Sequence, residues 1–394
     1  MEKHEYNSHL YLLIVVGTLG GLAPFVTDFY LPAMPALVEW FSSSISVVQV
    51  SLAACLAGIA VGQLVLGPLS DRFGRKRVLM LSIAVYCLAT AACIWAPTAR
   101  AFLLCRLLQG LSAAGGVVIS RSVASDVYSG DRLNRFFAML SVVQGISPVC
   151  APVLGGVMLS ATDWRGIFAM LLLLGLALAA ALVFFRETLP VERRQSGGVV
   201  KTFAAYAPVL RNVRFMYLVA AQALAMGVMF AYIAASPFIF QEHFGLSPLA
   251  YSLCFGLNAC GIMAGSIFAT RMGSAERALN AGARCLPLCG AAVVAMLLFV
   301  DSVVAVETSL FLMLMSIGVI LPPAATLAME CEPGHSGVAS AVIGFVMFML
   351  GGVVSPLVGL GDMLVSTAAV IAVCCMAAFV AIRRSVVRAC PATR

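Results

Sequence analysis

The sequence has 394 residues, of which 62% are hydrophobic and only 10% are charged, and its formal net charge is +7. A soluble chain of this length normally has about a quarter charged residues. The composition excludes a soluble enzyme, a disordered protein and a nucleic-acid-binding protein, because none of these keeps so much apolar surface away from water. Lipid must be the main solvent.

Long apolar runs predict helices that cross a bilayer, each of which needs about 20 residues. We expect the first run to be a retained helix and not a signal peptide, because it lacks a small-residue cleavage site and another span follows at once. The sequence therefore predicts an all-α membrane protein with twelve transmembrane helices. The runs cover residues 10–35, 46–69, 77–96, 101–124, 135–159, 166–185, 215–239, 249–270, 282–300, 307–329, 337–360 and 364–382.

Lysine and arginine residues indicate the orientation of these helices. If the amino terminus is cytoplasmic, all but three of the 24 fall in inward segments: Arg100 and Arg165 lie in outward loops, and Arg106 lies inside a span. The positive-inside rule then predicts that both termini are cytoplasmic. The positive net charge reflects this topology and not a nucleic-acid partner.

The longest polar stretch, from Arg186 to Arg214, separates two groups of six spans. We expect an N-terminal half at residues 1–190, a cytoplasmic linker at 191–213 and a C-terminal half at 214–394. Two similar halves around a linker are typical of secondary transporters that rock around a site near the middle of the membrane.

Charged residues inside apolar spans are costly, so they are functional candidates. Asp28 is the only carboxylate well inside a predicted helix, and it shares a helical face with Gly17, Gly21 and Pro24. At about 1.5 Å per residue, Asp28 and Arg106 lie roughly 10 Å and 7 Å below the outer surface, so we expect them to meet. Asp28 would bind and release protons, because a closed apolar cavity favours a neutral carboxyl group and a nearby cation favours a charged one. The alternative for both residues is a structural ion pair.

The short connection between the second and third spans combines glycines with charged residues. The glycines permit a tight turn, and the acidic and basic side chains can pair between helix ends. We expect this set to hold the cytoplasmic side closed when the protein opens outwards; a simple orientation signal is the alternative. Its members are Gly67, Asp71, Arg72, Gly74, Arg75 and Asp126, the last at the inner end of the fourth span.

Two further groups of residues suit a transporter, although ordinary membrane packing would also explain them. Glycines and prolines in the fifth span would let that helix bend and seal against a partner. They are Gly145, Pro148, Pro152, Gly155 and Gly156. Soft, aromatic and weakly polar side chains would line a permissive cavity. These are Tyr30, Gln109, Gln144, Gln222, Met226, Phe230, Tyr232 and Asn258.

Motifs for other chemistries are missing from the sequence. No lysine follows a glycine, as a phosphate-binding Walker loop requires. We therefore expect no cofactor, and we expect an ion gradient or the substrate's own gradient to drive transport. The thirteen cysteines form no disulfide framework, and they and the four histidines form no metal site. Neither H-E-x-x-H nor G-x-S-x-G is present, so we expect no enzyme.

Several of these segments resemble known motifs. Residues 67–77 resemble the signature loop of the major facilitator superfamily, G-x-L-a-D-r-x-G-r-k, between helices two and three. Residues 106–110 resemble its R-x-x-q-G element, and residues 151–156 resemble the end of its antiporter motif, G-P-x-x-G-G, with alanine in the first position. Thr-Asp-Phe-Tyr-Leu-Pro-Ala-Met-Pro at 27–35 and Glu-Thr-Leu-Pro at 187–190 are similar to motifs of the Bcr/CflA drug-resistance subfamily.

The resemblance covers nearly the whole first half and is weaker in the second. It implies a proton-coupled exporter in the bacterial inner membrane, with Asp28 and Arg106 serving coupling. Its substrates would be small drugs such as chloramphenicol, florfenicol, bicyclomycin or sulfonamides, and its other partners would be protons and lipid. Nothing in the sequence requires more than a monomer. The alternative is a dedicated carrier of an amino acid or a sugar in the same superfamily, although few polar residues lie on inward faces.

Overall fold

The structure is a computed structural model, and it describes residues 8–194, 206–332 and 336–387. Within these ranges, twelve helices are long and apolar enough to cross a membrane, which confirms the twelve predicted spans. Most of their boundaries lie within a few residues of the predicted ones. The ninth span differs most, because it begins at Ala275 and not at residue 282.

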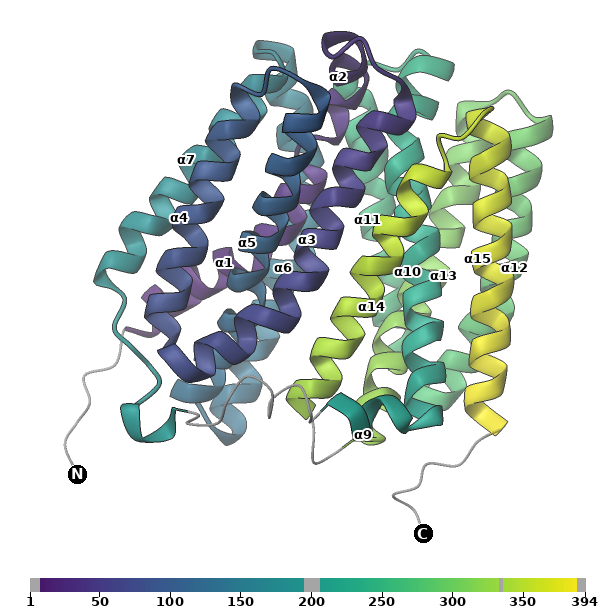
Figure 1. Ribbon diagram of the computed structural model, residues 1–394. Helices are drawn as coiled ribbons and strands as arrows, with labels where there is room; N and C mark the ends of the chain where they lie inside the picture. Colours follow the sequence, from purple (N-terminus) through teal and green to yellow (C-terminus); the bar gives the residue numbers. More distant parts are fainter. Residues whose placement is uncertain (1–7, 195–205, 333–335, 388–394) are drawn as a thin grey trace.

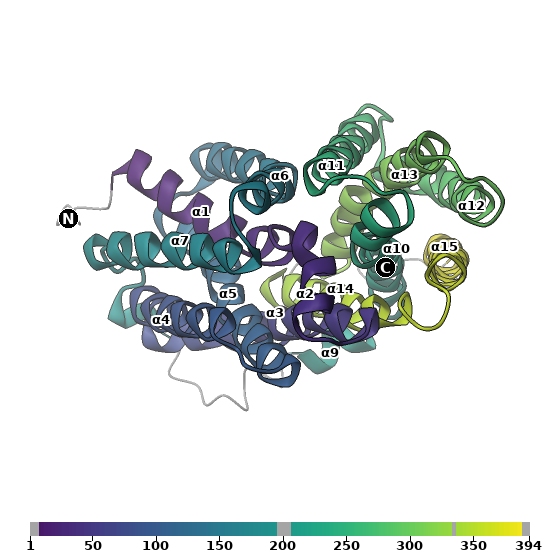
Figure 2. The ribbon, with the colours of Figure 1, turned by 90° about the horizontal axis from the view of Figure 1, so that it is seen from above.

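The helices form two groups that stand side by side (Figures 1 and 2). The N-terminal group consists of α1 (His9–Asp28), α2 (Met34–Trp40), α3 (Ile45–Phe73), α4 (Arg75–Ile94), α5 (Ala99–Val127), α6 (Gly130–Ala161) and α7 (Trp164–Phe184). The C-terminal group consists of α9 (Tyr206–Arg211), α10 (Val213–Phe238), α11 (Pro248–Thr270), α12 (Ala275–Phe299), α13 (Val303–Glu330), α14 (Ser336–Leu357) and α15 (Met363–Val387). Residues 195–205 of the predicted linker lie outside the described residues.

The first span is not one continuous helix. Helix α1 ends at Asp28, and a 3-10 turn, η1 (Leu31–Ala33), then leads into α2. Proline at positions 32 and 35 explains the interruption, because proline has no N–H to donate and disfavours helical geometry in the residue before it. Asp28 is therefore the last residue of a helix, and the carbonyl groups of that last turn have no partner within α1.

Small residues bring helices α3 and α5 together backbone to backbone. A β-carbon on Gly110 of α5 would lie within 3 Å of the Cys55 backbone, and one on Gly58 of α3 would meet the Leu107 carbonyl oxygen. Close approach of this kind lets membrane helices associate through van der Waals contact. This matters because the hydrophobic effect does not drive helix association within lipid. The pair places Arg106, one turn before Gly110, against the end of α1.

Helices α3 and α14, and α6 and α11, are the main pairs that join the two groups. Among the described residues, the side-chain hydrogen bonds between the groups lie at the end of the molecule that contains η1 and α2, which we call the α2 end. Ser46 Oγ donates to the Gly359 carbonyl over 2.6 Å, and Gln49 Nε2 donates to the Ala234 carbonyl over 3.0 Å. Gln241 Nε2 donates to the carbonyl of residue 32 in η1 over 3.2 Å.

The α3–α5 contact can be tested with a single methyl group. Gly110→Ala should destabilise the protein by about 1–3 kcal/mol, because the new Cβ overlaps backbone atoms that cannot move aside easily. Gly337→Ala is the matched control, since nothing lies within 4 Å of a β-carbon there. Thermal unfolding in detergent should show a lower midpoint for Gly110→Ala alone, and equal midpoints would contradict this packing.

Candidate functional site

A cavity of about 410 Å³ lies where the two groups of helices face each other. Its wall is mostly apolar and contains one carboxylate among the described lining residues. Helices α1, α6, α10, α11, α13 and α14 all contribute to it. The lining residues are Pro24, Thr27, Asp28, Gly145, Pro148, Met226, Met229, Phe230, Tyr232, Ile233, Phe255, Asn258, Ala259, Ile262, Met263, Ser266, Leu314 and Phe348.

Asp28, the last residue of α1, lines the cavity together with Pro24 and Thr27 of the same helix. The side chain is 5% exposed and lies among apolar and aromatic groups contributed by both halves. Within the described residues Asp28 forms no ion pair. A charged carboxylate is costly in such surroundings. It is therefore a group that a proton or a bound cation can neutralise.

Arg106 does not form the ion pair with Asp28 that the sequence suggested. Its guanidinium, completely buried, donates to Gln109 Oε1 over 2.6 Å and to the Val26 carbonyl over 3.1 Å. It also lies 4.2 Å from the centre of the Tyr30 ring. The Val26 carbonyl is one of the unpartnered groups in the last turn of α1, and the arginine satisfies it and meets the negative end of the helix dipole.

The eight residues predicted to line the cavity divide equally. Met226, Phe230, Tyr232 and Asn258 do line it. The other four do not, because each has a different neighbour.

Tyr30 lies under Arg106 and contacts Ser51 Oγ at 3.2 Å, and Gln109 bridges Arg106 to Thr90. Gln222 donates to the Leu321 carbonyl over 2.8 Å. Gln144 lies against Gly20 of α1.

The glycines and prolines of the fifth span, α6, lie between α1 and α11. Gly145 and Pro148 line the cavity, and Pro152 is buried. At Gly155 there is no room for a β-carbon beside the Phe29 carbonyl, and at Gly156 none beside Ser252 of α11. This face of α6 therefore approaches the interrupted first span on one side and the C-terminal group on the other.

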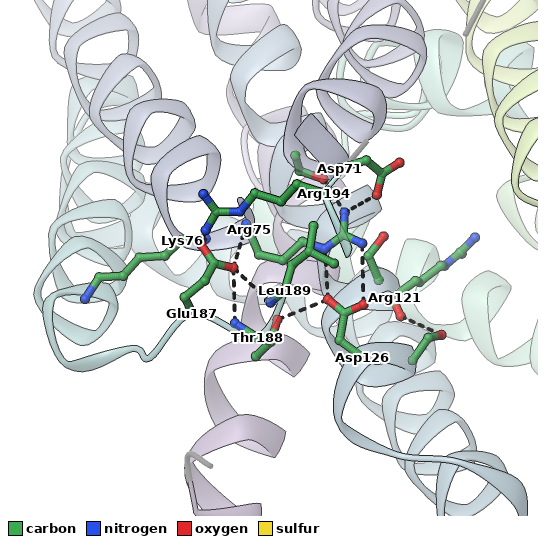
Figure 3. A network of polar contacts seen from close by, with 12 residues as sticks. Asp71, Arg75, Lys76, Arg121, Asp126, Glu187, Thr188, Leu189 and Arg194 are labelled. Atoms are coloured by element: carbon green, nitrogen blue, oxygen red, sulfur yellow. Dashed lines mark hydrogen bonds and ion pairs between the residues drawn. The ribbon is translucent and has the colours of Figure 1, made fainter. Parts of the chain in front are cut away.

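A polar network surrounds Arg75 at the end of the molecule opposite η1 and α2, which we call the Arg75 end (Figure 3). Arg75 donates to Asp71 Oδ1, to Ser70 Oγ over 2.7 Å and to Asp126 Oδ2 over 2.9 Å. It thus connects the end of α3, the start of α4 and the end of α5. The arginine is only 5% exposed, so these contacts are shielded from screening by water.

The residues after α7 complete this network, although no role was predicted for them. Glu187 accepts from the backbone N–H of Arg75 over 2.8 Å and of Lys76 over 3.2 Å, so its carboxylate caps the positive end of α4. Thr188 Oγ1 donates to Asp126, and Arg194 lies 3.8 Å from Glu187. The motif at 187–190 was visible as a family signature, but its contact with α4 was not.

Three other residues of the predicted set have different surroundings. Gly74 has φ +97, and a β-carbon there would collide with Glu187, so glycine is required on both counts. Gly67 instead packs against Val118 of α5. Arg72 is exposed, and its guanidinium lies 5.2 Å from the Phe73 ring, so it is not part of the network. All the contacts described around Arg75 lie within the N-terminal group and the segment that follows it.

A second carboxylate inside the C-terminal group was missed. Glu307 lies in the second turn of α13, whereas the predicted tenth span begins at this residue. Asn258 of the cavity wall donates to Glu307 Oε2 over 3.0 Å and to the Tyr232 hydroxyl over 3.1 Å. The structure thus connects a partly buried acidic group of the C-terminal group to the cavity wall.

The family model of the Major Facilitator Superfamily matches residues 16–356. The chain belongs to the Major Facilitator Superfamily. It is a transporter with a multi-pass membrane architecture, as the loop and helix-four motifs implied.

Curated relatives and solved structures agree with this assignment. The chain is 34% identical over 362 residues to the uncharacterized MFS-type transporter YdgK of Bacillus subtilis, covering 90% of each chain. It is 27% identical to a bicyclomycin resistance protein homolog of Haemophilus influenzae, again covering 90% of each. The xylose transporter XylE from E. coli, in a partially occluded inward-open conformation, has a similar fold, with a TM-score of 0.75 at 12% identity over 95% of this chain and 97% of that one.

Loss of the α4 cap should measurably lower the stability of the folded protein. Glu187→Gln removes the charge and one acceptor from the backbone N–H groups of α4, which should cost about 1.5–3 kcal/mol. Glu192→Gln is the control, because Glu192 is exposed in the same segment. Thermal unfolding in detergent measures the difference, and an unchanged midpoint for Glu187→Gln would show that the cap is dispensable.

Proposed function

We propose that this transporter exports small amphipathic drugs in exchange for protons. The supporting observation is Asp28, a carboxylate at the end of an interrupted helix, inside a mostly apolar cavity between the two groups of helices. A drug-sized molecule fits a cavity of about 410 Å³ lined by aromatic and methionine side chains. The resistance name of the Haemophilus influenzae relative favours drugs over metabolites as substrates.

Competition between substrate and proton would produce the exchange. A substrate that enters from the cytoplasm or the inner leaflet displaces water and a proton from the neighbourhood of Asp28. After the cavity opens to the outside, a proton binds the carboxylate and the substrate leaves. The apolar wall supports this cycle, because it makes an unneutralised charge costly during the change of access.

Alternating access requires two ends that open in turn. Hydrogen bonds join the groups at the α2 end, whereas those around Arg75 lie within one group. With the Arg75 end in the cytoplasm, as the positive-inside rule predicts, this arrangement is closed towards the outside. Asp71 and Arg75 would then face the C-terminal group only when the cytoplasmic end closes.

The same proposal includes the setting of the protein. We infer that the protein is a monomer in a bacterial inner membrane and that both termini are cytoplasmic. It would need no cofactor, and the proton gradient would be its energy source. Bacterial relatives and the distribution of lysine and arginine favour this setting.

Replacing Asp28 by asparagine should abolish the exchange without disturbing the fold. Asparagine has a similar shape but does not titrate, so gradient-driven drug movement should fall at least tenfold. Purified wild-type, Asp28→Asn and Glu192→Gln proteins are placed in proteoliposomes with an imposed pH gradient. The panel of labelled compounds includes chloramphenicol, and Glu192→Gln should behave as wild type.

Full gradient-driven transport by Asp28→Asn would refute the role of this carboxylate. Absence of any drug movement by the wild type would refute drug export, and the panel would then turn to amino acids and sugars. Thermal unfolding of each variant separates a loss of transport from a loss of folding.

A further inference from the structure

Glu307 is part of a polar cluster that the exchange cycle around Asp28 does not use. The cluster contains Tyr232 of α10, Asn258 of α11 and Glu307 of α13, and it belongs entirely to the C-terminal group. Two of its members, Tyr232 and Asn258, line the cavity, while Glu307 lies behind Asn258. A carboxylate inside a membrane helix normally has a partner of opposite charge. Among the described residues Glu307 has no ion pair.

The contacts fix the orientation of the Asn258 amide. A carboxylate only accepts hydrogen bonds, so the amide nitrogen and not its oxygen faces Glu307 Oε2. The same nitrogen donates to Tyr232, so both amide hydrogens are used. Asn258 is completely buried.

Two acceptor atoms in this cluster are left without a donor. Neither Asn258 Oδ1 nor Glu307 Oε1 has a hydrogen-bond partner in the described part of the chain, and both atoms are inaccessible to water. Buried polar atoms without partners cost free energy. A ligand in the cavity that donates hydrogen bonds would remove this cost.

Two pairs of aromatic rings line the cavity that Asn258 also lines. The Tyr232 and Phe255 rings are stacked with centroids 5.5 Å apart, and the Phe230 and Phe348 rings are 5.9 Å apart. All four residues line the cavity. Faces of aromatic rings attract cations, particularly away from water.

We propose that Tyr232, Asn258 and Glu307 form a recognition site for the protonated amine of basic amphipathic substrates. An ammonium group supplies the missing N–H donors, its charge is balanced by Glu307, and the aromatic rings accommodate the attached apolar body. A neutral drug can donate a hydrogen bond but cannot balance the charge of Glu307. This inference rests on the proposed function for the identity of the ligand as a transported substrate, but the site itself binds without a proton gradient.

The two carboxylates would then have separate tasks. Asp28, on the N-terminal group, exchanges protons with every substrate. Glu307, on the C-terminal group, selects for basic ones. Glu307→Gln should therefore change which compounds bind and leave the response of neutral compounds to a pH gradient intact.

Equilibrium binding to the full-length protein in detergent at neutral pH tests the site. The probes are labelled propranolol, a secondary amine that is protonated under these conditions, and labelled chloramphenicol, which is neutral. Glu307→Gln should weaken propranolol binding at least tenfold and change chloramphenicol binding less than twofold. Asp301→Asn is the matched control, because it removes an exposed carboxylate just before α13, and it should leave both unchanged.

Equal propranolol binding by the wild type and Glu307→Gln would overturn the proposal, as would a wild type that does not bind propranolol. If Glu307→Gln loses both probes, Glu307→Asp decides: recovery of propranolol binding supports the site, and no recovery overturns it. Because no gradient is imposed, a selective loss of amine binding stands even if proteoliposomes show no proton-driven transport. The reverse result, transport without amine selectivity, would overturn only this inference.

Discussion

The buried guanidinium of Arg106 is the interaction on which the arrangement of the N-terminal group depends. An arginine inside a bilayer costs several kcal/mol unless its hydrogen bonds and charge are satisfied. Here the two terminal nitrogens of the guanidinium donate to Gln109 and to the Val26 carbonyl, and the Tyr30 ring lies against it, while Nε has no hydrogen-bond partner among the described residues. The Val26 carbonyl is free because the prolines after Asp28 end α1 there. Arg106 therefore holds the end of α1 in place, and that end presents Asp28 to the cavity.

The same arrangement explains why the two ends of the molecule differ. Gly58 and Gly110 bring α3 against α5, and this contact fixes the position of Arg106. At its other end, α3 reaches the network around Arg75. That network connects the ends of α3, α4 and α5 within the N-terminal group, with Glu187 as the cap of α4. At the α2 end, single hydrogen bonds such as Ser46 to Gly359 connect the two groups. In the proposed cycle these bonds would break when the two groups rock against each other.

Apolar runs were sufficient to predict the twelve spans, and motif spacing was sufficient to bring Asp71, Arg75 and Asp126 together. Contacts made by the backbone could not be predicted. The break after Asp28 exposes a carbonyl group, and this carbonyl, not the carboxylate, binds Arg106. Tyr30 and Gln109 were expected in the cavity because they are polar, but Arg106 uses them instead. Glu307 was missed because a carboxylate one turn inside a helix looks like a helix end until Asn258 is seen to contact it.

In the proposed exchange, Asp28 binds a proton or a substrate, but not both. Proton release measures this directly: a drug that Asp28→Asn and the wild type both bind is added to each purified protein in weakly buffered detergent solution with a pH indicator. The wild type should release protons as the drug saturates it, and Asp28→Asn should release none. Equal release from the two proteins, or none from the wild type, would contradict it.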